Sequence, residues 1–279
     1  MIIKVEQTRE DFKNRFEITV NDQKRYLAGT PWMKMDIPLD ADRIRRCVLT
    51  DPAGNILFKT DYSVVQNVSN TAIPMKWLFT GKQKSLIYQV LDGNGAVCGT
   101  FYKLTKAFLD SRYVIQYKDY KLRCYDVSVG DTRHLSVYDK EKQIAEIVKP
   151  LSVENNLDFY LIFLLDEFAD TGAVLSFFTV LFDYLYYSGS GEVVVHKKEV
   201  SVRYSYSRNN KFYNKNWIAE HFRDDSARLL SEIQHNREKM LSDVKRQAKK
   251  ILLMIACFWG VALIVVLIIL YLKFGTGIL

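Results

Sequence analysis

Three acidic residues, Asp166, Glu167 and Asp170, stand close enough in the sequence to act as paired carboxylates in acid–base chemistry. They fall between a strand-like run and an apolar run that follows it. Acidic side chains in the first turn of a helix are stabilised by the partial positive charge of the helix N-terminus. We therefore interpret them as helix-start residues and predict no catalytic residue among them.

The histidines give no support for a metal centre, because none of them falls in an H-E-x-x-H motif or another short ligand spacing. His134 lies in a strand-like pattern, where a histidine with a structural hydrogen bond is the ordinary case. The sequence therefore predicts no metal site and no cofactor. The four histidines are His134, His196, His221 and His235.

Two glycine-containing stretches resemble catalytic motifs but fail in detail. Gly81-Lys82 is not a phosphate loop, because Lys76 stands where the first glycine of that motif belongs. Ser190 is flanked directly by glycines, whereas a nucleophile elbow has its glycines two residues away on either side. With these motifs excluded, we predict a protein that is not an enzyme.

A basic segment with interleaved aromatic residues is the strongest candidate for a binding surface. Aromatic rings between cations can stack on single-stranded nucleic acid, or they can lie at an anionic lipid surface. A solvated strand and linker is the third interpretation. The candidate lipid-surface residues are Lys197, Lys198, Arg203, Arg208, Lys211, Lys215 and Trp217.

The distribution of charge argues against nucleic acid. Residues 1–187 carry 24 basic and 24 acidic side chains, so the net charge of +7 belongs entirely to residues 188–279. A basic domain surface that would attract a polyanion is therefore not indicated. We expect membrane lipids to be the partner of this protein, and not nucleic acid.

Residues 251–272 form a run of 22 residues without a charged side chain. As a helix this run would be roughly 33 Å long, enough to cross the hydrocarbon core of a bilayer. Cations are retained on the cytoplasmic side of a membrane span, and four precede the run whereas one follows it. The sequence thus predicts a single-pass, tail-anchored protein with its N-terminal domain in the cytoplasm, at the cell membrane if the source is bacterial. The flanking cations are Lys245, Arg246, Lys249, Lys250 and Lys273.

Residues 1 to about 165 consist of short β-branched and aromatic runs, broken by turn residues every eight to twelve positions, as in antiparallel barrels and sandwiches. Asp92-Gly93-Asn94-Gly95 and Asp51-Pro52-Ala53-Gly54-Asn55 are typical hairpin connections, because Asn, Asp and Gly tolerate positive φ. The pattern gives about a dozen candidate strands.

The apolar segment 168–187 is hydrophobic on nearly every side, so as a helix it must be buried all round. A membrane crossing is the alternative, but the uncharged run 171–182 would reach only about 18 Å of the roughly 30 Å required. The sequence therefore predicts a mainly β fold, a closed antiparallel barrel of about 12 strands plugged by one apolar helix.

This arrangement resembles the tubby C-terminal superfamily, which includes the LURP-one-related proteins and the phospholipid scramblases. The residues that carry the resemblance are the serial hairpins, the run LSVENNLDFYLIFLL and the helix TGAVLSFFTVLFDYLYY. The resemblance implies a barrel around a buried helix. Within the superfamily, tubby proteins bind phosphoinositide headgroups, and scramblases are membrane-associated proteins with calcium-linked activity. No acidic calcium loop or cysteine-rich lipidation stretch matches, so no family site residue carries over.

We accordingly expect five parts: the tubby-like barrel over 1–187, a basic aromatic linker or extra strand over 188–217, a charged helical stalk over 218–250, the transmembrane helix 251–272 and a short tail over 273–279. The stalk has a weak coiled-coil seam, which leaves open self-association or another protein partner. The predicted function is a lipid-surface or protein-interaction module held at a membrane. The alternative is a scramblase-type lipid transporter or a membrane-bound enzyme.

Overall fold

A computed structural model describes the barrel region of the chain and a few positions beyond it. The described residues are 1–9, 15–31, 46–62, 64–107, 110–129, 132–150, 157–187 and 208–222, with isolated positions at 227, 229, 231, 253, 255, 257, 259 and 260. The chain forms two compact units, Met1–Arg228 and Leu229–Leu279. The first unit therefore extends past residue 187, where we expected the barrel domain to end.

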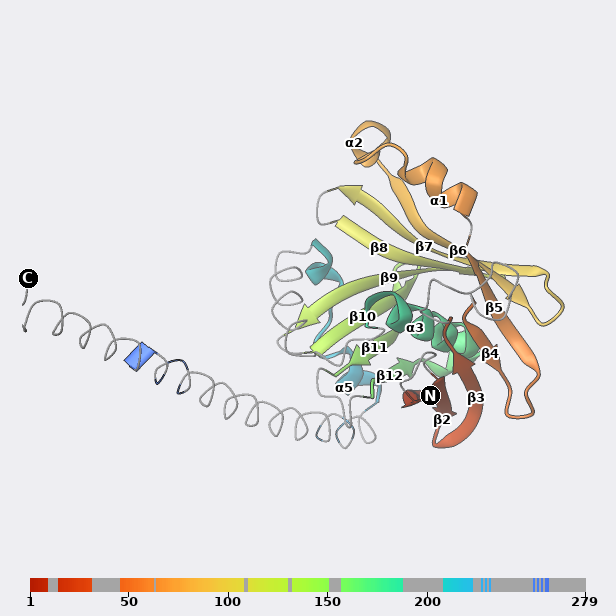
Figure 1. The fold of residues 1–279 in the computed structure, drawn as a ribbon. Helices are drawn as coiled ribbons and strands as arrows, with labels where there is room; N and C mark the ends of the chain where they lie inside the picture. The colour runs from red at the N-terminus through yellow and green to blue at the C-terminus, as the bar shows by residue number, and fades with distance from the viewer. Residues whose placement is uncertain are drawn as a thin grey trace, which may run out of the picture. The chain divides into compact units, whose positions relative to one another are not determined.

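Twelve antiparallel strands form a closed barrel in which each strand pairs with its neighbours in the sequence (Figure 1). The barrel closes where β1 pairs with β12, with Ile3 opposite Ile162. This confirms the predicted mainly β barrel. The strands are β1 Ile2–Arg9, β2 Arg15–Val20, β3 Gln23–Gly29, β4 Val48–Thr50, β5 Ile56–Tyr62, β6 Gln83–Asp92, β7 Val97–Ala107, β8 Asp110–Tyr117, β9 Tyr120–Val129, β10 Thr132–Asp139, β11 Lys142–Lys149 and β12 Phe159–Leu164.

Both predicted hairpin turns are present. Between β6 and β7, one carboxylate oxygen of Asp92 accepts hydrogen bonds from the backbone N–H groups of Asn94 and Ala96, both at 2.9 Å. Gly95 has a φ of +85°, a conformation that costs little only for a residue without a Cβ. The turn chemistry in the sequence thus set the register of this hairpin.

The apolar segment predicted as a helix is the short 3-10 helix η1, Asp166–Thr171, followed by α3, Gly172–Tyr186. α3 packs against inward-facing side chains from strands on several sides of the barrel. Phe177 contacts Phe58 of β5 and Phe101 of β7 through ring pairs at 5.8 and 6.0 Å. Asp183, near its C-terminal end, contacts Tyr160 of β12. These contacts confirm an apolar helix packed against the closed sheet.

Helix Asp166–Tyr186 is the one segment among the described residues that is long and apolar enough to cross a membrane, and 67% of its apolar stretch is buried within the protein. Burial of this kind is expected of a core helix. The predicted anchor 251–272 falls mostly outside the described residues. At the described positions of that run the chain is helical, and Leu253, Ile255 and Trp259 are exposed.

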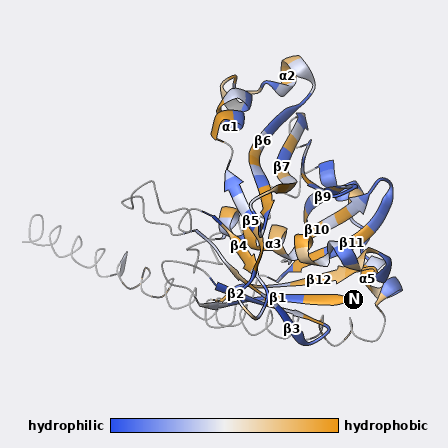
Figure 2. Ribbon diagram, turned by 90° about the vertical axis from the view of Figure 1, so that its right-hand side faces the viewer, coloured by the Kyte–Doolittle hydropathy of each residue, from blue (hydrophilic) through white to orange (hydrophobic). Residues whose placement is uncertain are grey.

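An insertion between β5 and β6 carries two further helices, α1 Val64–Thr71 and α2 Trp77–Thr80. We refer to residues 64–82 as the β5–β6 insertion. α1 packs against β6, and α2 against β7. Figure 2 shows that both helices stand at one end of these strands and that α1 carries hydrophobic residues. These two helices are not among the elements that the sequence predicts.

After α3, the next described residues begin at 208 and contact the barrel. They form the 3-10 helix η2, Arg208–Phe212, and the short helix α5, Trp217–His221. Phe222 has φ −134° and ψ 47°, outside the helical region, so α5 ends at His221. Ala227, Leu229 and Ser231 are again helical, and the rest of the predicted stalk 218–250 lies outside the described residues.

Candidate functional site

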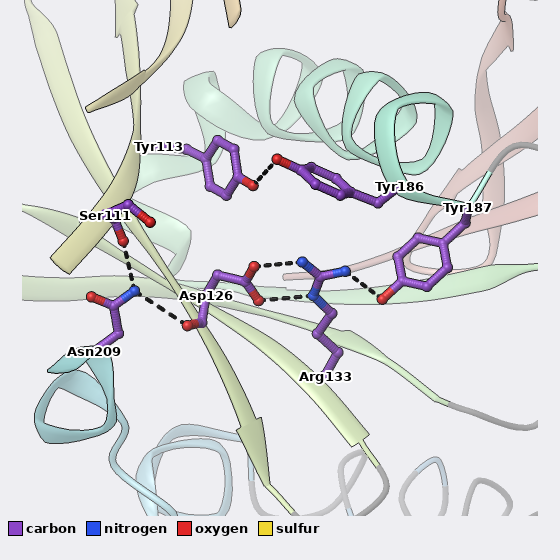
Figure 3. Close-up of polar contacts among 7 residues, drawn as sticks. All are labelled: Ser111, Tyr113, Asp126, Arg133, Tyr186, Tyr187 and Asn209. Carbon is purple, nitrogen blue, oxygen red and sulfur yellow. Dashed lines mark hydrogen bonds and ion pairs between the residues drawn. The ribbon is translucent and has the colours of Figure 1, made fainter. Parts of the chain in front are cut away.

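Asn209 fastens the predicted basic segment to the outside of the barrel. Its side chain is buried, and its amide nitrogen donates hydrogen bonds to the backbone carbonyls of Ser111 on β8, at 2.7 Å, and of Asp126 on β9, at 3.3 Å (Figure 3). Buried amides that satisfy backbone groups fix the position of the segment that carries them. η2 therefore has a defined place on β8 and β9.

Two aromatic residues of the basic segment pack onto the barrel. The ring of Phe212 stacks on that of Tyr125 at a centroid distance of 3.8 Å, and its carbonyl accepts a hydrogen bond from Tyr138. Tyr213 contacts the ring of His134. Burial, with a smaller contribution from Glu146, raises the pKa of Tyr213 to about 12. These two rings serve as attachments to the barrel and do not form a free stacking platform.

Of the predicted lipid-surface residues, three cations are exposed on this segment: Arg208, Lys211 and Lys215. Trp217 is different, because it is only 4% exposed and its ring packs on His221 and Phe222. The tryptophan therefore stabilises the local fold and is absent from the exposed face that presents the cations. Outside the described residues lie Lys197, Lys198 and Arg203, and also the membrane-flanking Lys245, Arg246, Lys249, Lys250 and Lys273.

Behind Asn209, on the inside of the barrel, a buried ion pair joins two strands to the central helix. Arg133 of β10 binds both carboxylate oxygens of Asp126, at 2.8 and 2.5 Å, and donates a third hydrogen bond to the hydroxyl of Tyr187 (Figure 3). Its guanidinium also lies 4.5 Å from the centre of the Phe182 ring. Bidentate pairs of this kind hold their partners in a narrow range of geometry. Asp126 thus connects the helix end on the inside with Asn209 on the outside.

A second buried pair, Lys149 with Asp158, lies beside the same end of α3. The ammonium group of Lys149 stands over the rings of Tyr160 and Tyr187. Asp183 of α3 accepts a hydrogen bond from the Tyr160 hydroxyl at 2.6 Å. Its second carboxyl oxygen is buried and has no hydrogen-bond partner in the described part of the chain. Burial, and then the negative charge of Asp158, raise the pKa of Asp183 to about 7.

The charges of the two pairs cancel, because the positive charges of Arg133 and Lys149 equal in number the negative charges of Asp126 and Asp158. An ionised Asp183 would add one unpaired negative charge inside the barrel, which is why its neutral form is favoured. The side chains of these residues are at most 11% exposed. The arrangement can position α3 and the basic segment, but it offers no exposed group to a substrate.

Sequence reasoning missed this buried cluster although its signal was present. Arg133 stands in phase with Leu135 and Val137, and Lys149 with Ile147, so strict alternation points both cations to the inner face of the barrel. Charged residues at inward positions are rare unless they are paired. A search for charges in phase with buried apolar residues would have found them.

The three acidic residues of η1, of which Asp166 and Glu167 lie in its first turn and Asp170 near its end, have separate partners. Glu167 pairs with Lys142 at 2.5 Å, Asp166 with the amino group of Met1 at 2.6 Å, and Asp170 accepts a hydrogen bond from Tyr120. They do not form a shared acid–base pair. Among the described residues, the structure also contains no group of three or more His, Cys, Asp and Glu side chains placed to hold a metal ion.

His134 has the structural role expected of it. Its ring is buried, and its Nδ1 lies 3.0 Å from one carboxylate oxygen of Glu146. The other carboxylate oxygen of Glu146 accepts a hydrogen bond from Gln143. The ring stands behind Tyr213 and thereby supports the basic segment.

Comparison of the chain with models of protein families, with curated proteins and with solved structures finds no match. The class of protein is therefore defined by the fold and its surface alone. It is a closed, up-and-down β-barrel with one apolar helix packed against it and with a cationic segment fixed to the outer face of β8 and β9.

Proposed function

We propose that this protein is a membrane-anchored, non-catalytic binding module that works at a lipid surface on the cytoplasmic side. The observation that carries the proposal is the uncharged run 251–272, preceded by four cations within six residues. The exposure of Leu253, Ile255 and Trp259 supports the proposal. Apolar side chains that the rest of the protein leaves exposed need an apolar partner, and a bilayer is one.

The barrel supports a binding role at its outer surface. Its interior is occupied by the side chains of α3 and of the surrounding strands, which form one continuous core. The exposed cations Arg208, Lys211 and Lys215 are held by a segment that is itself clamped to the barrel. Each cation near an anionic membrane surface contributes about 1 kcal/mol, so three in one segment suit weak, reversible contact with lipid headgroups.

The closed twelve-stranded barrel with its apolar helix agrees with the architecture that the resemblance to the tubby C-terminal superfamily implies. We propose kinship with that superfamily on this basis. The proposal concerns architecture only, because no site residue of that superfamily carries over to this chain.

Membrane anchoring is tested by expressing the full chain and a variant with Val265→Arg and Ile268→Lys, then floating membranes on a density gradient after alkaline extraction. The full chain should remain in the membrane fraction. The variant should be extracted, because charges near the centre of a span cost about 2.5–3.5 kcal/mol each. Extraction of the unaltered chain would refute the anchor.

The lipid-surface role is tested with the first compact unit, residues 1–228, against vesicles with and without anionic lipid. The unaltered unit should float only with anionic vesicles. Reversal of the cations by Arg208→Glu, Lys211→Glu and Lys215→Glu should abolish this binding. Arg25→Glu, a charge reversal at an exposed position on β3, is the control. Equal flotation with neutral and anionic vesicles would remove the electrostatic part of the proposal.

A further inference from the structure

The helix α1 of the β5–β6 insertion is oriented opposite to a normal surface helix. Its polar residue Asn67 is buried against the barrel, whereas Val64, Val65 and Val68 are 61, 81 and 60% exposed. A surface helix of a soluble protein ordinarily directs its apolar side chains to the core and its polar ones to water. Most of the surface of each of these three valines is therefore exposed.

Two hydrogen bonds of Asn67 fix this orientation. Its amide nitrogen donates to the carbonyl of Ile87 and its amide oxygen accepts from the N–H of the same residue, both at 2.9 Å. The neighbouring Leu86 has a φ of +50°, at a shift in the pairing of β6 with β7. Because the hydrogen-bond ladder between β6 and β7 is interrupted here, the N–H and the carbonyl of Ile87 are available to the side chain of Asn67. α1 cannot turn its valines inward without losing both bonds.

The second half of the insertion presents further apolar side chains in the same way. Phe79 is 81% exposed and Leu78 is 57% exposed, on the single-turn helix α2. Gly81 ends that helix with a φ of +69°, and its N–H bonds to the carbonyl of Trp77. The hydroxyl of Thr80 bonds to the carbonyl of Lys82 at 2.6 Å. Phe79 is therefore held outward by an ordered turn.

Charge on and near the insertion has one sign. Residues 62–91 contain three lysines, Lys76, Lys82 and Lys84, and no acidic residue. Lys82 and Lys84 are exposed beside the apolar side chains, and Lys84 stands over the ring of Tyr102. Apolar and aromatic side chains rimmed by lysines are the composition of elements that lie in the interface of an anionic membrane. A protein partner would be equally well served by acidic residues beside the apolar ones, and residues 62–91 contain none.

We propose that the β5–β6 insertion enters the surface of an anionic lipid bilayer, with Val65, Leu78 and Phe79 among the acyl chains and the lysines at the headgroups. This inference rests on the membrane attachment proposed above and gives the barrel a second point of contact. The bilayer is either the one that holds the anchor or one that faces it.

The test places an environment-sensitive dye on the full chain in anionic proteoliposomes. Cys98→Ser and Cys257→Ser remove the accessible thiols, while Cys47 and Cys124 are buried. Phe79→Cys or Leu78→Cys carries the dye. The matched control is Val97→Cys on β7, an apolar residue that is 59% exposed. It pairs with Leu91 at the end of β6 far from the insertion, about 30 Å of strand away.

Lipids that carry a nitroxide group serve as the quencher of the dye. In one arm of the experiment these lipids are part of the proteoliposomes, and in the other arm they are in added protein-free vesicles. We expect quenching at positions 78 and 79 to exceed that at 97 by about twofold or more in one arm, which also identifies the bilayer. Equal quenching at all three positions, in chains that still float, overturns the inference alone. A dye shielded from water but not quenched means that a protein covers the insertion, which also overturns it. Chains that fail to float refute the anchor and the inference together.

Discussion

α3 and α1 both carry bulky apolar side chains, but they place them in opposite surroundings. In α3 the residues from Val174 to Phe182 are buried against the barrel strands. In α1 the valines face outward, and the buried position belongs to Asn67. Bulky apolar side chains on a helix need an apolar partner. The polar contacts that fix the orientation of the helix determine on which side that partner must lie. For α3 the partner is the barrel, and for α1 we infer a bilayer.

Removal of the buried arginine gives the largest expected effect. Arg133→Ala leaves Asp126 buried without its partner, and breaking such a pair costs about 3–5 kcal/mol of folding free energy. Arg123→Ala is the control, since its partner Glu141 is 95% exposed, and it should cost at most about 1 kcal/mol. Urea denaturation of the detergent-solubilised chain measures both. Similar losses for the two variants would contradict the role assigned to Arg133.

Truncation of a core aromatic ring on α3 should cost nearly as much. Phe177→Ala opens a cavity between Phe58 and Phe101, and we expect a loss of about 3–5 kcal/mol. Phe79→Ala on α2 removes a ring of the same size from an exposed position and should change folding stability by less than about 0.5 kcal/mol. A large loss for Phe79→Ala would show that the Phe79 ring itself packs against the protein.

The neutral carboxyl of Asp183 predicts a pH dependence. Because its pKa is raised from 3.8 to about 7, the folded chain keeps a proton that the unfolded chain releases. The stability contributed by this group is complete below about pH 4, falls as the pH rises and is lost above about pH 7.

Asp183→Asn removes that loss, so at pH 8 the variant should melt several degrees above the unaltered chain, by about 4 °C or more. The difference should shrink as the pH is lowered to 5. Asp170→Asn, at an exposed position in η1, should show no such trend. A variant that is less stable than the parent at both pH values would disprove a protonated Asp183.

The smallest and most local effect is expected at the base of α1. Asn67→Ala removes both bonds to Ile87, and amides in residues 64–82 should exchange with solvent about tenfold faster or more. Global melting should change little, because the barrel strands are untouched. Ser69→Ala, whose hydroxyl bonds within its own helix, is the control. Unchanged exchange in the Asn67 variant would show that α1 is held by other contacts.

Much of the barrel was predictable from local sequence rules. Turn residues such as Gly95 marked the hairpins, and the apolar length of 168–187 required a buried helix. The sequence also favoured closure of the sheet into a barrel. The particular pairing that closes it, Ile3 of β1 with Ile162 of β12, joins residues too distant in sequence for a local pattern to show.

The candidate site was predicted only in part. Arg208, Lys211 and Lys215 are exposed as expected, but Trp217 looked equally accessible in the sequence, and its packing on Phe222 depends on how the chain returns to the barrel. In α1, Val64, Val65 and Val68 have helical spacing that ordinarily predicts a core-facing stripe. The side-chain bonds of Asn67 to Ile87 reverse it, and no periodicity reports such a tertiary contact.

The most direct test of the account is a spin label at Phe79 on the full chain in anionic proteoliposomes, relaxed in turn by lipid-soluble oxygen and by a water-soluble nickel complex. If the insertion lies in a bilayer, oxygen should relax this label more effectively than nickel, and a label at Val97 should show the reverse. Stronger relaxation of both labels by nickel would place the β5–β6 insertion in water and contradict the assignment of a lipid partner to α1.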